Sequence, residues 1–159
     1  MVAAVGGALL LAATAGATVM LLAFRGRVPA ALRAVRRFNR EVTNVSPRRT
    51  AGRAGSGTAL LRHRGRVSGA SYATPLGATR VADGFEIALP YGRDTDWLRN
   101  LRAAGWAVLE VGGVAHRVDD PRIVPIASAQ VATTDARTIR VFGIREAVRV
   151  RSTPISVMR

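Results

Sequence analysis

The chain has 159 residues, a length that fits one domain with a short appendage, and its 24 basic residues against 10 acidic ones give a net charge of +14. It has no cysteine and only two histidines, His63 and His116, which excludes disulfide scaffolds, thiol catalysis, cysteine-ligated zinc, iron–sulfur clusters and a histidine-rich metal site. We therefore predict no metal site, and we expect a cofactor to carry the chemistry if the protein is an enzyme.

The first 24 residues contain no charged side chain. A helix of this length extends about 36 Å at ~1.5 Å per residue, enough to cross a hydrocarbon core of about 30 Å. Arginines follow at once, and positive flanks stay in the cytoplasm. Residues 1–25 are therefore predicted to be a transmembrane signal anchor, with the rest of the protein on the cytoplasmic side. The alternative is a cleaved signal peptide, since the alanine-rich stretch offers cleavage sites.

Residues 26–57 are predicted to form a basic juxtamembrane helix and a linker. Residues 25–66 hold twelve arginines against one acid, a net charge of +11. Apolar residues recur at three- and four-residue steps over Val28–Asn44, which predicts an amphipathic helix, and Ser46–Gly57 is rich in glycine and serine. We expect residues 25–49 to contact anionic lipid. The alternative is a helix that packs on the domain with solvated arginines. Nucleic acid is not expected as a partner, because the arginines lack interleaved aromatic residues.

Residues 58–159 show the pattern of short strands with few helices. The predicted strands are Thr58–Arg64, Ser71–Ala82, Phe85–Pro90, Trp106–Val111 and Val114–Val118. One helix is expected over Asp96–Ala104, capped by Asp94 and ended by Gly105, and a second over most of Ile123–Val141 after a turn at Asp119–Pro121. Ile144–Met158 fits either a helix or a strand. These elements predict an α+β fold built on a small antiparallel barrel.

Five segments of this domain, in this order, carry a resemblance to a known family. They are Gly65–Gly69 (GRVSG), Thr74–Leu76 (TPL), Asp83–Gly92 (DGFEIALPYG), Thr95–Gly105 (TDWLRNLRAAG) and His116–Pro125 (HRVDDPRIVP). The series resembles the actinobacterial deazaflavin-dependent nitroreductase family, over roughly residues 60–151. The resemblance implies a split β-barrel of the flavin-reductase-like type, and reduced coenzyme F-420, an 8-hydroxy-5-deazaflavin, as hydride donor. It also implies quinone or nitro compounds as acceptors. FMN is the alternative cofactor.

The resemblance also implies where the cofactor is held. Its anionic tail is expected at the glycine turn and the strand leading to TPL, and its ring between the strand end LPYG and the start of the TDWLRN helix. The implied contact residues are Arg64, Arg66, Ser68, Gly69, Thr74, Pro75, Pro90, Tyr91, Gly92, Trp97 and Asn100. Backbone amides at a glycine turn and at a helix N-terminus bind anions well.

The sequence departs from the family at Val67, Ala70 and Ala73, where members usually carry basic residues. Three explanations are open. The arginines at positions 62, 64, 66 or 93 replace the missing charges, or the protein binds a different flavin, or it has lost catalysis.

Several single residues have both a structural and a functional interpretation. Tyr91 is the candidate catalytic proton donor, or else a partly exposed loop aromatic. Trp97 is either a core aromatic or a wall of the cofactor site, and Asn100 either binds a neighbouring loop or belongs to the site. Asp96 is expected to stabilise the helix N-terminus, and His63 to lie on the surface.

The sequence thus predicts a membrane-anchored deazaflavin-dependent reductase that acts on a small lipophilic acceptor. The alternative is a non-catalytic split-barrel protein that binds a flavin, a lipid or a protein partner at the membrane. An oligomer is compatible with both.

Overall fold

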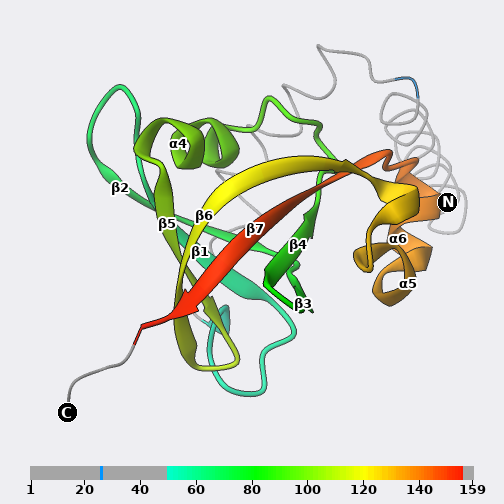
Figure 1. Ribbon diagram of the computed structural model, residues 1–159, viewed down its shortest axis with the longest axis horizontal. Helices are drawn as coiled ribbons and strands as arrows, with labels where there is room; N and C mark the ends of the chain where they lie inside the picture. Colours follow the sequence, from blue (N-terminus) through cyan, green and yellow to red (C-terminus); the bar gives the residue numbers. More distant parts are fainter. Residues whose placement is uncertain (1–25, 27–49, 156–159) are drawn as a thin grey trace, which may run out of the picture.

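The computed structural model describes Gly26 and residues 50–155, and their fold is a single curled antiparallel sheet with few helices (Figure 1). Seven strands pair in the order β2-β1-β5-β6-β7-β4-β3. Their bounds are β1 Ala59–Arg64, β2 Ser71–Leu76, β3 Thr79–Val81, β4 Gly84–Ala88, β5 Trp106–Val111, β6 Val114–Pro125 and β7 Glu146–Pro154. The helices are α4 Asp96–Ala104, the 3-10 turn η2 Ile126–Ser128, α5 Val131–Thr134 and α6 Ala136–Phe142. This arrangement fits the predicted split barrel.

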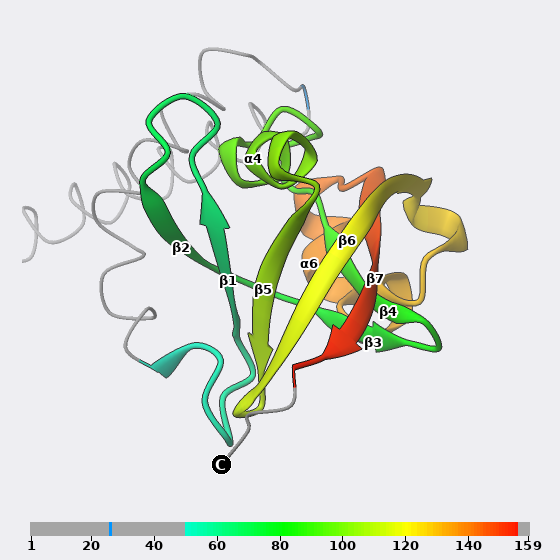
Figure 2. The same ribbon diagram turned by 60° about the vertical axis from the view of Figure 1, so that its left-hand side comes forward.

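The connection between the two edge strands makes the sheet curl. The two edge strands, β2 and β3, are consecutive segments joined only by Gly77 and Ala78. Because two residues span only a few ångströms, the two edges of the sheet must lie close together. Figure 2 shows the resulting curl, with α4 lying across the end of the barrel next to the β1–β2 turn. The sequence prediction of one long bent strand over Ser71–Ala82 corresponds to this pair.

The barrel interior is filled by side chains that alternate along the strands. In β1, Ala59 and Leu61 are buried in the core while Arg62 and Arg64 are exposed. Phe85 and Ile87 of β4 meet Val148 and Val150 of β7 in the same cluster. From α4, Leu98 and Leu101 join that cluster. Helix α4 is therefore fixed to the barrel by its apolar side, and its N-terminus is held at a defined place.

Helix α4 has the predicted bounds, but the residue at its N-cap position is Thr95 rather than the predicted Asp94. The helix ends at Gly105, whose φ of 77° is the left-handed conformation that glycine adopts without strain. The β1–β2, β3–β4 and β5–β6 hairpins were all expected, and Ile144–Met158 resolves as strand β7 up to Pro154.

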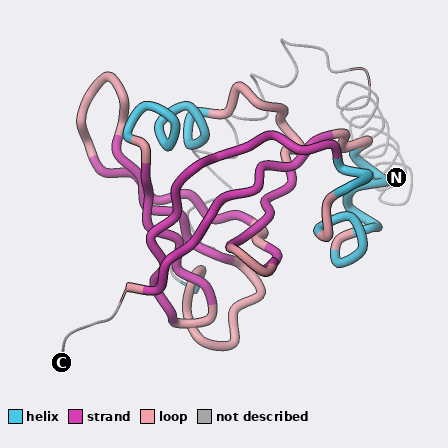
Figure 3. Tube along the Cα trace, in the orientation of Figure 1, coloured by secondary structure: helices cyan, strands magenta, loops and turns pink. Residues whose placement is uncertain are grey.

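Two sequence expectations about the chain after Val118 are wrong. Asp119–Pro121 is not a turn but an irregularity within β6, where Asp120 has a φ of 50° and the register against β7 shifts between Asp119 and Arg122. Ile123–Val141 is not mostly one helix, because Ile123 to Pro125 still pair with β7 and the rest breaks into η2, α5 and α6. Figure 3 shows this short, interrupted helical region beside the sheet. Strand pairing overrides the local helical pattern here.

The predicted anchor and juxtamembrane helix lie outside the described residues. Within the part of the chain that the structure describes, no helix is both long and apolar enough to cross a bilayer. The described end of the predicted linker runs through turns against the barrel. The amide of Gly52 donates to the Thr58 carbonyl over 2.8 Å, and the carbonyl of Gly52 accepts from the Gly113 amide over 2.6 Å.

Candidate functional site

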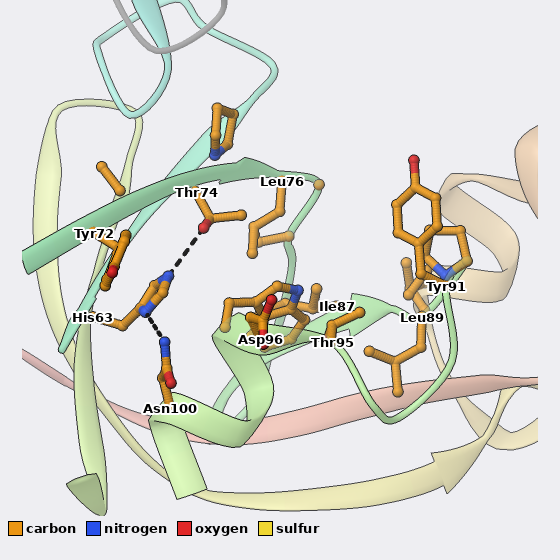
Figure 4. A pocket seen from close by; sticks show the side chains of 18 of the residues that line it. His63, Tyr72, Thr74, Leu76, Ile87, Leu89, Tyr91, Thr95, Asp96 and Asn100 are labelled. Carbon is orange, nitrogen blue, oxygen red and sulfur yellow. Dashed lines mark hydrogen bonds between the residues drawn. The ribbon is translucent and has the colours of Figure 1, made fainter. Parts of the chain in front are cut away.

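A pocket of about 880 Å³ lies between β2, the β4–α4 loop, the start of α4 and the α5–α6 region (Figure 4). Eight of the eleven predicted contact residues line it: Arg66, Ser68, Thr74, Pro75, Pro90, Tyr91, Trp97 and Asn100. The glycine turn, the TPL strand, the LPYG segment and the TDWLRN helix, which are separate in sequence, therefore meet at one place. Its volume is in the range of small-molecule sites, roughly 300–1,000 Å³.

Three predicted contact residues do not line the pocket. Gly69 and Gly92 each follow a lining residue and take positive φ angles of 67° and 75°, so they shape the turns that present Ser68 and Tyr91. Arg64 is exposed and alternates onto the outer face of β1 with Arg62. Of the two arginines among the predicted contact residues, only Arg66 lines the pocket.

At the polar end of the pocket, the side-chain amide of Asn100 joins α4 to β1 and to the β1–β2 turn. Its Oδ1 accepts hydrogen bonds from the backbone amide of Arg66, over 3.1 Å, and from the Arg66 guanidinium, over 3.0 Å. Because Oδ1 receives both donors, the other end of the amide is Nδ2, which lies 3.1 Å from His63 Nδ1 and donates to it. Asn100 is buried, and its bond to His63 is shielded from water, while its two bonds to Arg66 are partly buried. The sequence left two roles open for Asn100, binding a neighbouring loop or belonging to the cofactor site, and the structure shows the first of them directly.

His63 is buried, not on the surface as the sequence suggested, because it alternates inward with Leu61. Its Nδ1 accepts from Asn100, so Nε2 carries the proton and donates to Thr74 Oγ1 over 3.0 Å. The imidazole is therefore neutral and in one tautomer. Burial lowers the pKa of His63, although the nearby Asp96 carboxylate acts in the opposite direction. The sequence did not indicate that His63 is buried, because an arginine flanks it on each side.

Tyr72 covers the outer side of His63. The two rings stack with centroids 5.7 Å apart and planes at 18°. The Tyr72 hydroxyl lies 3.2 Å from Ser68 Oγ, which also accepts from the amide of Ala70. Tyr72 was not predicted as a site residue, yet it lines the pocket and ties the strand β2 to the glycine turn.

The centre of the pocket is apolar and lies at the start of α4. Leu76, Ile87 and Leu89 form its walls, and Trp97 both packs against the core and lines the pocket. Asp96, in the first turn of α4, accepts from the Arg66 guanidinium over 3.2 Å. Thr95, just before the helix, is buried and faces the same space (Figure 4).

The far end of the pocket is closed by the α5–α6 region. Thr79 and Thr134 bring their hydroxyls to 2.8 Å from each other across it. Fully buried Glu86 holds α5 in place, because its Oε2 accepts from the amide of Val131 over 3.0 Å and its Oε1 pairs with Arg149. Nothing in the sequence distinguished Glu86 from a surface carboxylate on an edge strand.

The chain resembles known proteins over most of this domain. A model of the F-420H(2)-dependent quinone reductase family matches residues 31–150. A solved structure of an F-420 reductase is 10% identical, with a TM-score of 0.40, over 62% of this chain and 86% of that one. A protein of unknown function from Agrobacterium tumefaciens is 19% identical, with a TM-score of 0.33, over 62% of this chain and 51% of that one. No curated protein matches.

The neutral state of His63 predicts a pH dependence of stability. Since folding lowers its pKa below the value of about 6.5 in an unfolded chain, its contribution is present above that pH and is lost on acidification. Burial, with repulsion from Arg80, lowers the pKa of His116 in the same direction. We expect the free energy of unfolding in urea to fall between pH 7 and pH 5.5, by at most about 1.4 kcal/mol per pH unit for each histidine.

In the variant His63→Gln, which keeps an acceptor for Asn100, the free energy of unfolding should decrease less between pH 7 and pH 5.5 than in the wild type. The variant His116→Gln measures the contribution of the other histidine to that decrease. An unchanged pH dependence in His63→Gln would contradict the assignment of a neutral, tautomer-fixed imidazole.

Proposed function

Because the chain belongs to the F-420H(2)-dependent quinone reductase family, we propose that it transfers a hydride from reduced coenzyme F-420 to a lipophilic quinone or nitro-type acceptor. Membership of the family implies coenzyme F-420 as the cofactor. The single observation that carries the proposal is the pocket itself, which joins a polar end at the glycine turn to an apolar centre at the start of α4.

The residues of the pocket fit a ring with an anionic tail. Aliphatic walls and the face of Trp97 suit a planar ring system. The turn at Gly65–Gly69 supplies backbone amides and the Arg66 guanidinium for the tail. When bound, the reduced deazaflavin supplies the hydride.

The chain's own residues bind, orient and exclude water. The Asn100–His63–Thr74 hydrogen bonds hold β1, β2 and α4 at fixed positions, so the pocket is formed before a ligand enters. Tyr91 lines the pocket, partly buried, at the β4–α4 loop, and in this proposal its hydroxyl donates the proton that the reduced acceptor needs.

The charge missing at Val67, Ala70 and Ala73 is replaced, in this proposal, by Arg66. Two of the other candidates are engaged elsewhere, Arg62 with Glu110 and Arg93 with Glu146. Arg66 uses only Nη1 to bind Asp96 and Asn100, and its Nε and Nη2 form no hydrogen bond with the residues that the structure describes. Those two groups are suited to a bidentate contact with a phosphate or carboxylate.

The contact between the Arg66 guanidinium and the anionic tail is tested by Arg66→Ala. Arg64→Ala is the matched control, because it removes the same charge two residues away and outside the pocket. Loss of charged hydrogen bonds of about 1.5–3 kcal/mol predicts at least a tenfold weaker binding of oxidised F-420, measured by fluorescence titration. Arg64→Ala should change affinity less than threefold.

A deazaflavin that lacks the tail should bind Arg66→Ala and the wild type alike. Equal losses in Arg66→Ala and Arg64→Ala would show that the effect is general electrostatics and not a clamp.

The reaction is tested by single-turnover oxidation of reduced F-420, followed by its absorbance, with and without a menaquinone analogue. The full chain in detergent should oxidise the cofactor faster with the quinone than without it, and Tyr91→Phe should slow this step while leaving cofactor affinity nearly unchanged. A wild-type chain that binds the cofactor but shows no acceptor-dependent oxidation would favour the non-catalytic alternative.

The lipophilic acceptor is consistent with a membrane location, which belongs to the same proposal. Its support is in the sequence: 24 uncharged residues at the start, followed by an arginine-rich stretch. The catalytic domain would then face the cytoplasm, and residues 25–49 would contact anionic lipid.

The topology predicts that a reporter fused after Arg159 is active only where cytoplasmic reporters work, because the arginine flank is retained inside. A periplasmic or extracellular signal, or a mature chain that begins near Ala17, would contradict the anchored topology and favour a cleaved signal peptide.

A further inference from the structure

Few charged side chains line the pocket, and most of them are acidic. Among the described residues that line it, the formally charged ones are Arg66, Asp96 and Asp135. His63 adds no charge, because burial lowers its pKa. The lining therefore carries one positive and two negative charges, although the whole chain has a net charge of +14. The basic excess of the protein does not extend to the described walls of the pocket, so these walls do not favour a ligand with many negative charges.

Arg66, the cation among these lining residues, has few donors left for a ligand. Its Nη1 already donates to Asp96 Oδ1, over 3.2 Å, and to Asn100 Oδ1, over 3.0 Å. Nε and Nη2 lie on one edge of the planar guanidinium, where they form the two parallel hydrogen bonds that one phosphate or carboxylate accepts. Arg66 therefore has room for one anionic group.

The surroundings of Arg66 supply little further positive charge. Residues 67–79, which form the rest of the glycine turn, β2 and the connection to β3, contain no charged side chain. At the tip of the turn, Val67 is 91% exposed. The arginine in the first turns of α4, Arg99, pairs with Asp94 over 3.1 Å. A second anionic group on a ligand thus finds no unpaired cation beside the first among the described residues that line the pocket.

Asp96 places a negative charge at this same end of the pocket. Its side chain is 67% exposed, against 33% for the Arg66 side chain that it binds, so the carboxylate lies at the edge of the pocket in contact with water. It also lies in the first turn of α4, where an acidic residue offsets the partial positive charge of the helix N-terminus. A second negative group, close to the one that Arg66 holds, would approach this carboxylate and be repelled.

We propose that Asp96 is a specificity-determining residue: the polar end of the pocket takes a ligand with one anionic group, and Asp96 selects against further negative charges beside it. This inference rests on the proposed function, because the tail of F-420 is a phosphodiester followed by a variable number of glutamates. Arg66 binds the phosphate, and the glutamates gain little from the pocket. The protein therefore binds forms of the cofactor with short and long tails about equally.

The test measures how affinity depends on the charge of the tail. Three oxidised deazaflavins are titrated by fluorescence into the full chain in detergent: one without a tail, one with the phosphate but no glutamate, and one with the phosphate and several glutamates. The variant Asp96→Asn removes the charge and keeps an acceptor for Arg66. Asp94→Asn is the matched control, because Asp94 is an exposed, arginine-bound acid two residues away and outside the pocket lining. The melting temperature of each variant shows that it is folded.

In the wild type, the phosphate should tighten binding about tenfold over the form without a tail, and the glutamates should then change the Kd less than about threefold. Asp96→Asn should bind the long-tailed form at least about threefold more tightly than the wild type does, because the repulsion is gone, and should bind the form without a tail unchanged. Asp94→Asn should leave all three Kd values within about twofold of the wild type.

The proposal is overturned if glutamates tighten binding to the wild type about tenfold or more, because cations beyond the described lining then hold the tail. It is equally overturned if the phosphate has no effect, or if Asp96→Asn and Asp94→Asn change the affinity for the long-tailed form to the same extent. A wild-type chain that binds none of the three deazaflavins contradicts the proposed function itself, which is a separate result.

Discussion

The pocket depends on one side-chain amide, that of Asn100. It comes from α4, which the core holds by Leu98 and Leu101, and it reaches both β1 and the turn that follows it. Both polar atoms of the Asn100 amide and both ring nitrogens of His63 have partners, and His63 continues the connection to Thr74 in β2. A buried network is favourable only when it is complete. The glycine turn therefore has one position relative to the helix start, and the pocket has one shape.

The same constraint separates the chemical tasks of the two halves of the pocket. Most polar groups of the polar half bind one another, so they hold β1, β2 and α4 in place and leave few donors for a ligand. Among the described residues that line the pocket, Arg66 keeps two guanidinium donors, Nε and Nη2, without a hydrogen bond. Arg66 lies at the glycine turn, away from the apolar centre, as a ligand with a charged tail and an apolar ring would require.

The sequence predicted those features that local patterns determine. Alternation gave the strands, the Asp83-Gly84 and Gly112-Gly113 pairs gave hairpins, and the α4 bounds followed from amphipathic spacing and Gly105. The family match confirms the resemblance that placed the site. What failed depends on long-range pairing: the strand character of Ile123–Pro125, imposed by β7, and the burial of His63, fixed by Asn100 37 residues away.

The central claim is that the deazaflavin binds in this pocket, and amide chemical-shift mapping of the ¹⁵N-labelled full chain in detergent tests it most directly. On addition of oxidised F-420, the account predicts shifts at the glycine turn 65–69, in β2, at Tyr91 and at the first turn of α4. The outer face around Trp106 and Arg117, where the guanidinium lies 4.9 Å from the indole centroid, should not change. Shifts centred on that outer face, or none at saturating cofactor, would contradict it.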